Sequence, residues 1–191
     1  AESVVRAVLP CPSTHLQRLA VCVSDLIEFS RPVPDHNLDT ADLRKRVATA
    51  TWVCRHQLRG VELHINIPDG TLLPCYPAAL TQVFVNLLLN GASAVSNSHG
   101  HGKIEITAES TDTAHRIRIR DNGQGIAPED IKRLADPFYS TSDTPDNLGL
   151  GLSICQTIMR HHKGSMWITS EPGQWTEVTL TLPKTAARRG G

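Results

Sequence analysis

Two pairs of alternating segments constrain the fold of this chain more than any other feature. Apolar and polar residues alternate over 103–110 and 115–121, and again over 165–171 and 176–183. A short connection separates the segments of each pair, which is typical of antiparallel neighbours. Helical patterns stand between the pairs, without the strict strand–helix alternation of a parallel sheet. We therefore predict an α+β fold, a two-layer sandwich in which helices cover a mixed, mostly antiparallel sheet.

The N-terminal part has a different pattern. Residues 14–30 carry apolar side chains at helical spacing and follow a shorter helical stretch at 1–9. Together they predict a partial helical hairpin over 1–34, whose apolar stripe needs a second chain to bury it. The tail, 185–191, is expected to be disordered. Residues 35–184 then form the main domain.

Further elements are expected inside this domain. A helix should be capped by Thr40 and stopped by Gly60, and a strand should follow at 61–67. Three more helices are expected, a long one over 77–95, a short one over 127–135 and one over 148–164 that glycines open and close.

Composition excludes some classes of function. Lys and Arg number 19 and so do Asp and Glu, so the formal net charge is zero. That balance argues against broad binding to nucleic acid or to an anionic membrane, because both need clustered positive charge. No apolar run reaches the ~18 residues of a membrane span. The five cysteines are scattered and unpaired in spacing, which indicates a cytoplasmic protein without a zinc site or disulfide framework.

Two asparagines interrupt the apolar face of the 77–95 helix. Asn86 and Asn90 are four residues apart and project from one side. A buried amide must find a partner. The two amides either bond a neighbouring helix or face a cation and its phosphates, since oxygen ligands suit Mg²⁺.

Asp121 ends an alternating strand and begins a glycine-rich turn, "DNGQG". Such a turn is also typical of a hairpin, but a helical pattern follows it, so the turn leads away from the sheet. Asp121 then stands at the sheet edge, where its carboxylate can accept a hydrogen bond from an exocyclic amine such as adenine N6. The glycines let a flat base approach the backbone.

A third element is the glycine pair before the 148–164 helix. Gly149 and Gly151 precede the first amides of that helix, and a helix N-terminus favours anions. The preceding polar stretch, 137–147, is either a mobile lid or an ordinary surface loop.

Taken in order, Asn-x-x-x-Asn, Asp-x-Gly-x-Gly, Pro-Phe and Gly-x-Gly-Leu closely resemble the catalytic ATP-binding domain of two-component sensor histidine kinases. That family belongs with the gyrase, Hsp90 and MutL type ATPases. The resemblance covers about residues 36–183 and looks most like the nitrogen-regulatory branch. It implies the Bergerat fold with ATP and Mg²⁺ as ligands. Residues 14–30 resemble the second helix of the family's dimerisation and histidine-phosphotransfer hairpin.

The resemblance also implies roles for individual residues. Asn86 and Asn90 match the asparagines that hold Mg²⁺ and phosphates, and Asp121 matches the aspartate that reads adenine. The implied ATP site comprises Asn86, Asn90, Asp121, Gly123, Gly125, Ile126, Phe138, Thr141, Gly149, Leu150, Gly151, Leu152 and Thr176.

The chain departs from the family pattern at several positions. No histidine stands in the sequence context of the family's phosphoacceptor, so we expect the acceptor upstream. Ser93 and Ser142 stand where the family has basic or amide side chains, which removes positive charge near the phosphates. Trp175 replaces a glycine and either narrows the base pocket or caps the sheet. Arg133 either supplies charge or has a surface role.

These features lead to one main hypothesis and two alternatives. The main one is a histidine kinase domain that passes the ATP γ-phosphoryl group to a histidine on a homodimeric hairpin, for relay to a response regulator receiver domain. Asn86 stands where the related ATPases have a hydrolytic Glu, so transfer is favoured over hydrolysis. The alternatives are a degenerate nucleotide-binding scaffold without kinase activity and an ATPase clamp. The whole protein could be anchored in a membrane, but this part is not expected to insert.

Overall fold

A five-stranded sheet forms the main layer of the molecule. The computed structural model describes residues 38–96, 101–131, 133–134 and 149–184. The strand order is β2 (Glu62–Asn66), β4 (Lys103–Ser110), β5 (Ala114–Asp121), β7 (Trp175–Pro183) and β6 (Ser165–Glu171). β2 and β4 are parallel, and the other neighbours are antiparallel. The predicted mixed, mostly antiparallel sheet is confirmed; the hairpin over 1–34 and the tail lie outside the described residues.

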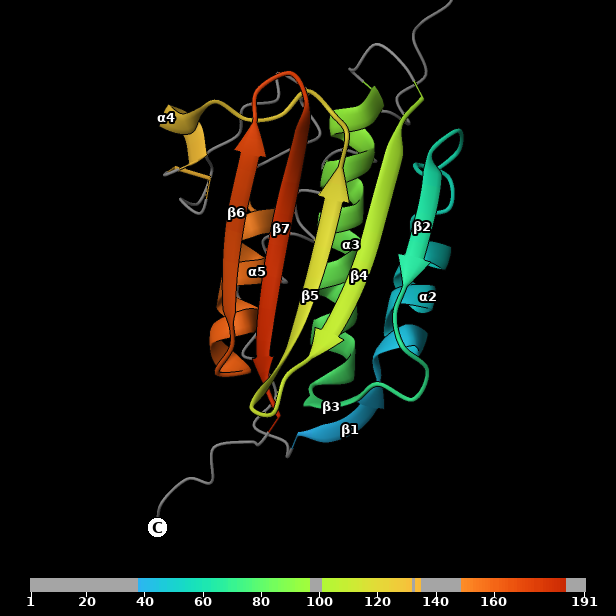
Figure 1. The fold of residues 1–191 in the computed structure, drawn as a ribbon, viewed down its shortest axis with the longest axis vertical. Coiled ribbons are helices and arrows are strands. Elements are labelled where there is room, and N and C mark those ends of the chain that lie inside the picture. The colour runs from blue at the N-terminus through green and yellow to red at the C-terminus, as the bar shows by residue number, and fades with distance from the viewer. Residues whose placement is uncertain (1–37, 97–100, 132, 135–148, 185–191) are drawn as a thin grey trace, which may run out of the picture.

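Helices form the second layer and cover one face of this sheet (Figure 1). They are α2 (Leu43–Val53), α3 (Pro77–Ser96) and α5 (Gly151–His161). α3 lies behind the central strands, and α5 lies behind β6 and β7. The short helix α4 (Pro128–Ile131) lies beside one end of β6. The predicted two-layer α+β sandwich is therefore confirmed.

α3 is the central core helix. Pro77 occupies its first turn, where the missing N–H costs no hydrogen bond. Its length and apolar composition would suit a membrane span, but in this fold its apolar face packs against other elements, with Leu80, Val83 and Phe84 fully buried. The core that it fills thus explains its composition.

A second, two-stranded sheet was not expected from the sequence. β1 (Asp39–Asp42) pairs antiparallel with β3 (Leu72–Cys75), with Thr40 opposite Pro74. The prediction that Thr40 caps the next helix is therefore wrong, since Thr40 lies inside β1. Asp42 is the cap instead, and its carboxylate accepts a hydrogen bond of 3.2 Å from the Lys45 amide.

Three helices also differ from their predicted limits. The first helix ends at Val53 rather than near Gly60, and turns fill the interval. The short helix covers only Pro128–Ile131 of the range expected. α5 begins at Gly151, shortly after Gly149, whose φ of 67° is left-handed. It ends at His161, shortly before Lys163, whose φ of 56° is also left-handed. These left-handed residues interrupt the helical hydrogen-bond pattern and so set the limits of α5.

His162 joins the end of α5 to the start of α3. Its Nε2 accepts a hydrogen bond of 2.9 Å from the Tyr76 amide, and its Nδ1 donates to the Ile158 carbonyl at 2.8 Å. Only neutral histidine can accept at one nitrogen and donate from the other. Burial lowers the pKa of His162 below its ordinary value, which maintains this neutral form.

Through His162, the stability of the protein should decrease as the pH falls below about 6.5, because the unfolded His162 takes up a proton there and the folded one does not. His162→Leu should cost about 1–3 kcal/mol at neutral pH, since the Tyr76 amide loses its acceptor. The variant should also depend less on pH. Urea unfolding at about pH 7.5 and about pH 5.5 measures both effects.

His56→Leu, at an exposed position on a turn, is the matched control and should leave both quantities unchanged. His115 is also buried with a lowered pKa, so it too makes the protein less stable as the pH falls. Asp121, whose pKa is raised, acts in the opposite direction. Both groups are present in every variant, so the difference between variants isolates His162. An unchanged pH dependence in His162→Leu would contradict the role assigned to His162.

Candidate functional site

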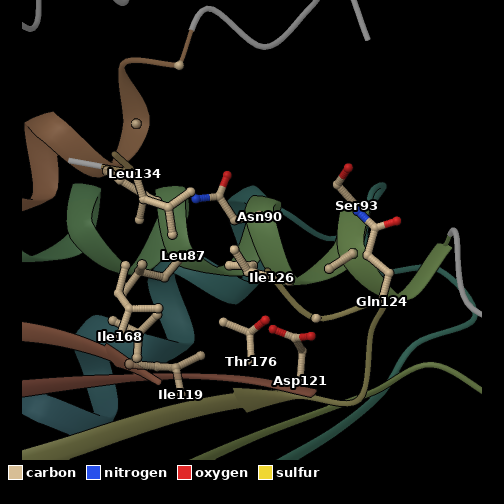
Figure 2. A pocket seen from close by; sticks show the side chains of 17 residues that line it. Leu87, Asn90, Ser93, Ile119, Asp121, Gln124, Ile126, Leu134, Ile168 and Thr176 are labelled. Carbon is tan, nitrogen blue, oxygen red and sulfur yellow. The ribbon is translucent and has the colours of Figure 1, made fainter. Parts of the chain in front are cut away.

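A pocket of about 130 Å³ lies between α3, the end of β5, the start of β7 and the start of α5. α3 and α5 form its helical side, and the sheet forms the other (Figure 2). Its lining residues are Leu87, Asn90, Gly91, Ser93, Ala94, Ile119, Asp121, Gln124, Gly125, Ile126, Leu134, Gly149, Gly151, Leu152, Ile168, Thr176 and Val178.

Most of the residues predicted from the sequence meet in this pocket. Those that line it are Asn90, Asp121, Gly125, Ile126, Gly149, Gly151, Leu152 and Thr176. Asn86, Gly123 and Leu150 lie next to it without lining it. Phe138 and Thr141 lie outside the described residues.

Asp121 ends β5 and is 9% exposed at the sheet side of the pocket. α3 comes close to it at Gly91, where an added Cβ would stand 3.7 Å from the Asp121 Cβ. The Gly123 amide donates a hydrogen bond of 2.9 Å to Oδ1. Burial raises the pKa of Asp121 to about 6 and outweighs the hydrogen bonds from the Gly123 and Thr176 amides, which lower it.

Thr176 and Asp121 form a pair across two strands. They are direct partners in the β5–β7 register, and Figure 2 shows their side-chain oxygens side by side. The next inward-facing partners, Ile119 and Val178, are apolar. The site therefore combines a polar end with an apolar wall, as a heteroaromatic ring with polar edges requires.

Sequence reasoning missed the apolar wall. Ile119 and Val178 stand two residues from Asp121 and Thr176, so the period of two in a strand could have identified them. Ile168 faces the same side from β6. Leu87 and Ser93 line the pocket from α3, each three residues from Asn90.

The glycine-rich turn is held between α3 and the β6–β7 connection. An added Cβ on Gly123 would stand 2.6 Å from the Ala94 carbonyl carbon, and the Gln124 amide donates to the Ala94 carbonyl at 3.2 Å. On the other side, the Gly173 amide donates to the Gln124 carbonyl at 2.7 Å. Gly125 has a φ of 66°, and its added Cβ would stand 2.2 Å from the Glu171 carbonyl oxygen. Only glycine suits this position.

The two asparagines of α3 have different surroundings. Asn86 donates to the Gly151 carbonyl at 3.2 Å and accepts from Gln82 Nε2 at 3.2 Å, so its amide already joins α3 to α5. Asn90 lines the pocket, and its amide makes no hydrogen bond with another described residue. Of the two alternatives left open by the sequence, Asn86 fits the helix–helix contact and Asn90 fits a ligand.

The first turn of α5 faces the pocket at Gly151 and Leu152. Leu150, at the N-cap, provides no side-chain cap for the first amides, and it is itself buried. This turn therefore offers N–H groups and a positive dipole end to an anion. No Lys or Arg is among the described residues that line the pocket.

Trp175 lies away from the pocket. The Arg120 guanidinium stands 4.0 Å from the centre of its ring, and Arg120 also pairs with Glu177 at 3.8 Å. These side chains alternate with Asp121 and Thr176 and so face the opposite side of the sheet. Trp175 therefore caps the sheet and does not narrow the pocket.

A metal ion in this pocket could not be coordinated by described protein side chains alone. In the part of the chain that the structure describes, no three His, Cys, Asp or Glu side chains gather into a metal-binding group. The Asn90 amide oxygen is the donor of the right chemistry for Mg²⁺, which accepts one or two protein ligands beside phosphate oxygens and water.

Gly125→Ala should destabilise the protein more than Gly173→Ala. Both glycines have a positive φ, but an added Cβ meets nothing within 4 Å at Gly173. Both changes should lower the free energy of unfolding by about 1–2 kcal/mol, because alanine is strained in a left-handed backbone conformation. Gly125→Ala should cost about 1–3 kcal/mol more, because the chain must move away from Glu171. Chemical unfolding of the two variants measures the difference, and equal losses would contradict the tight contact.

The titration of Asp121 should be visible in the free protein. Its pKa of about 6 in the folded state exceeds the ordinary value of 3.8. Its contribution to stability is therefore full below pH 3.8 and is lost as the pH rises through 6. Asp121→Asn, which stays neutral, should unfold at higher urea than the wild type near neutral pH. Carboxyl-carbon NMR should give the pKa directly, and a value near 4 would contradict the effect of burial.

Comparison with known proteins agrees with this geometry. The family model described as histidine kinase-, DNA gyrase B- and HSP90-like ATPase matches residues 75–186. The sensor histidine kinase ZraS of Escherichia coli strain K12 is 29% identical over 175 residues, 90% of this chain and 36% of the relative. Sporulation kinase C of Bacillus subtilis strain 168 is 32% identical over 176 residues, 89% of this chain and 39% of the relative.

A solved structure has the same fold. Full-length ShkA in complex with AMPPNP gives a TM-score of 0.76 at 22% identity, over 91% of this chain and 38% of that one. The chain spans little more than a third of the length of the curated relatives named above. The family model matches more than half of the chain and includes the whole described pocket. The chain belongs to the family of histidine kinase-, DNA gyrase B- and HSP90-like ATPases.

Proposed function

We propose that this domain binds Mg-ATP for transfer of the γ-phosphoryl group to a histidine. The observation that carries the proposal is the Asp121–Thr176 pair beside an apolar wall, at one end of a pocket whose other end is the start of α5. The adenine would lie against Ile119 and Val178 with its amine toward Asp121. The phosphates would extend toward Asn90 and the first turn of α5.

Mg²⁺ would be held by Asn90 together with the phosphates. The ion supplies neutralisation of the phosphate charge, which is the largest electrostatic requirement of phosphoryl transfer. In the present arrangement Asn86 positions the start of α5 through the Gly151 carbonyl. As a ligand beside Asn90 it would use its Oδ1, which in the present arrangement accepts a hydrogen bond from Gln82 Nε2.

The residues of the domain would act mainly by positioning. Asp121 orients the base, the apolar wall excludes water, and the amides of α5 hold the phosphate chain in line. Asn86 stands where related ATPases have a Glu that activates water. An amide is not a general base, so the γ-phosphoryl group would await an external acceptor.

The acceptor and partners belong to the whole protein. The relatives are sensor and sporulation kinases, which supports a cytoplasmic histidine kinase of the two-component type. We propose an acceptor histidine on a dimeric hairpin upstream of this domain and a response regulator receiver domain as the final phosphoryl acceptor. Placement in the nitrogen-regulatory branch, and any membrane anchor of the whole protein, remain predictions from the sequence.

Asp121→Asn should weaken ATP binding and keep the fold. A hydrogen bond to a charged group contributes about 1.5–3 kcal/mol, so the dissociation constant should rise about 10- to 150-fold. Isothermal titration calorimetry with Mg²⁺ and a non-hydrolysable ATP analogue measures this. Asp112→Asn, at an exposed position in the turn between β4 and β5, removes the same charge away from the pocket and is the matched control. If Asp121→Asn binds as well as the wild type, the base-reading role is wrong.

The scaffold alternative follows from the absence of Lys and Arg among the described residues of the pocket. The same calorimetric titration separates the two functions. Failure of the wild type to bind nucleotide at millimolar concentration would favour a scaffold. Binding followed by phosphoryl-histidine formation in the full-length protein would establish the kinase, and the domain by itself should bind without phosphorylating itself.

A further inference from the structure

Ser170 joins three segments of the pocket through one hydroxyl group. It lies near the end of β6, directly opposite Thr176 in the β6–β7 register. Its Oγ lies 2.7 Å from the Trp175 carbonyl oxygen, 2.9 Å from the Ile126 amide nitrogen and 3.1 Å from Thr176 Oγ1. Ser170 itself does not line the pocket.

The direction of each of these hydrogen bonds follows from chemistry. A carbonyl oxygen only accepts, so the single Ser170 hydroxyl hydrogen is donated to Trp175. An amide N–H only donates, so one Ser170 lone pair accepts from Ile126. The remaining lone pair faces Thr176, so the Thr176 hydroxyl must be the donor in that contact. Ser170 is then fully satisfied, with one donated and two accepted hydrogen bonds.

This arrangement decides what Thr176 offers to a ligand. Its only hydroxyl hydrogen points to Ser170, so its lone pairs are what remain for the pocket that it lines. Asp121 beside it also accepts when it is ionised. The polar end of the pocket thus consists of two acceptors. Two acceptors suit an exocyclic amine, which has two hydrogens, and oppose a carbonyl oxygen at the same position of a base.

We propose that Ser170 is a positioning residue that sets the hydrogen-bond direction of Thr176 and thereby makes the site discriminate a 6-amino purine from a 6-keto purine. The inference rests on the proposed nucleotide function and deepens it. Ser170 does not touch the base; it acts through Thr176. Its bond to the Ile126 amide also holds the residue that follows the glycine-rich turn, so a purely structural role is the competing explanation.

The test compares ATP with ITP, whose base carries a carbonyl group in place of the amine. Dissociation constants of both nucleotides, with Mg²⁺, are measured by calorimetry for the wild type, Ser170→Ala and Ser170→Thr. In Ser170→Ala the Thr176 hydroxyl can turn toward the pocket and donate to the carbonyl group. The preference for ATP over ITP should fall about 3- to 10-fold, the effect of one net hydrogen bond. Ser170→Thr keeps a hydroxyl and should retain most of the preference.

Ser165→Ala, on the exposed side of the same strand, is the matched control and should bind both nucleotides as the wild type does. If Ser170→Ala weakens ATP and ITP equally, the residue is only structural and the inference is overturned. Thr176→Val gives a second test if Ser170→Ala does not fold. It removes the hydroxyl group itself, and an unchanged ATP to ITP ratio in that variant would also overturn the inference. A wild-type protein that binds neither nucleotide would instead contradict the proposed function.

Discussion

The close packing of α3 on the inner face of the sheet is the constraint on which the rest of the structure depends. At Gly91 an added Cβ would stand only 3.0 Å from Ile104 Cδ1 and 3.7 Å from the Asp121 Cβ. The missing side chain lets the helix lie against β4 and β5 at the level of the pocket. A larger residue would move the helix that carries Asn90 away from the strand that carries Asp121. The buried face of α3 is thus both the core of the domain and one wall of the site.

Hydrogen bonds from segments far apart in the chain complete this arrangement. The glycine-rich turn is joined to α3 through Ala94 and to the β6–β7 connection through Gly173. Asn86 joins α3 to the start of α5, and His162 joins the far end of α5 to the start of α3. Because both ends of α5 are tied to α3, the two helices that face the pocket form one unit. The described walls of the pocket are therefore held together by contacts of the protein itself.

The site carries a cost in stability that its chemistry explains. Asp121 is buried enough for its pKa to rise to about 6, so near neutral pH the folded protein holds an ionised carboxylate in poor solvation. The same desolvation strengthens any hydrogen bond that the carboxylate makes to a ligand. His162 behaves in the opposite sense, because its burial is compensated by two hydrogen bonds in the neutral form. The buried Asp121 thus favours ligand binding, whereas the buried neutral His162 stabilises the folded state.

The sequence by itself determined the five strands of the main sheet, the long core helix and eight of the 17 residues that line the pocket. Local pattern is sufficient for these, because a period of two or of 3.6 depends only on neighbouring residues. β1 and β3 were not predictable in this way. Their short segments, with Pro74 in one and mainly polar residues in the other, acquire strand geometry only by pairing with each other.

Only the tertiary structure decided which role each of the predicted residues has. Sequence spacing places Asn86 and Asn90 on one side of α3, but only the position of α5 shows that Asn86 bonds Gly151 while Asn90 faces the pocket. Trp175 lies on the outer face because the register sets Thr176 opposite Asp121. No sequence pattern indicated the hydrogen bonds of Ser170, because its three partners lie in another segment or across a hairpin turn. Local residue order specifies the elements, and long-range contacts specify which atoms of those elements meet.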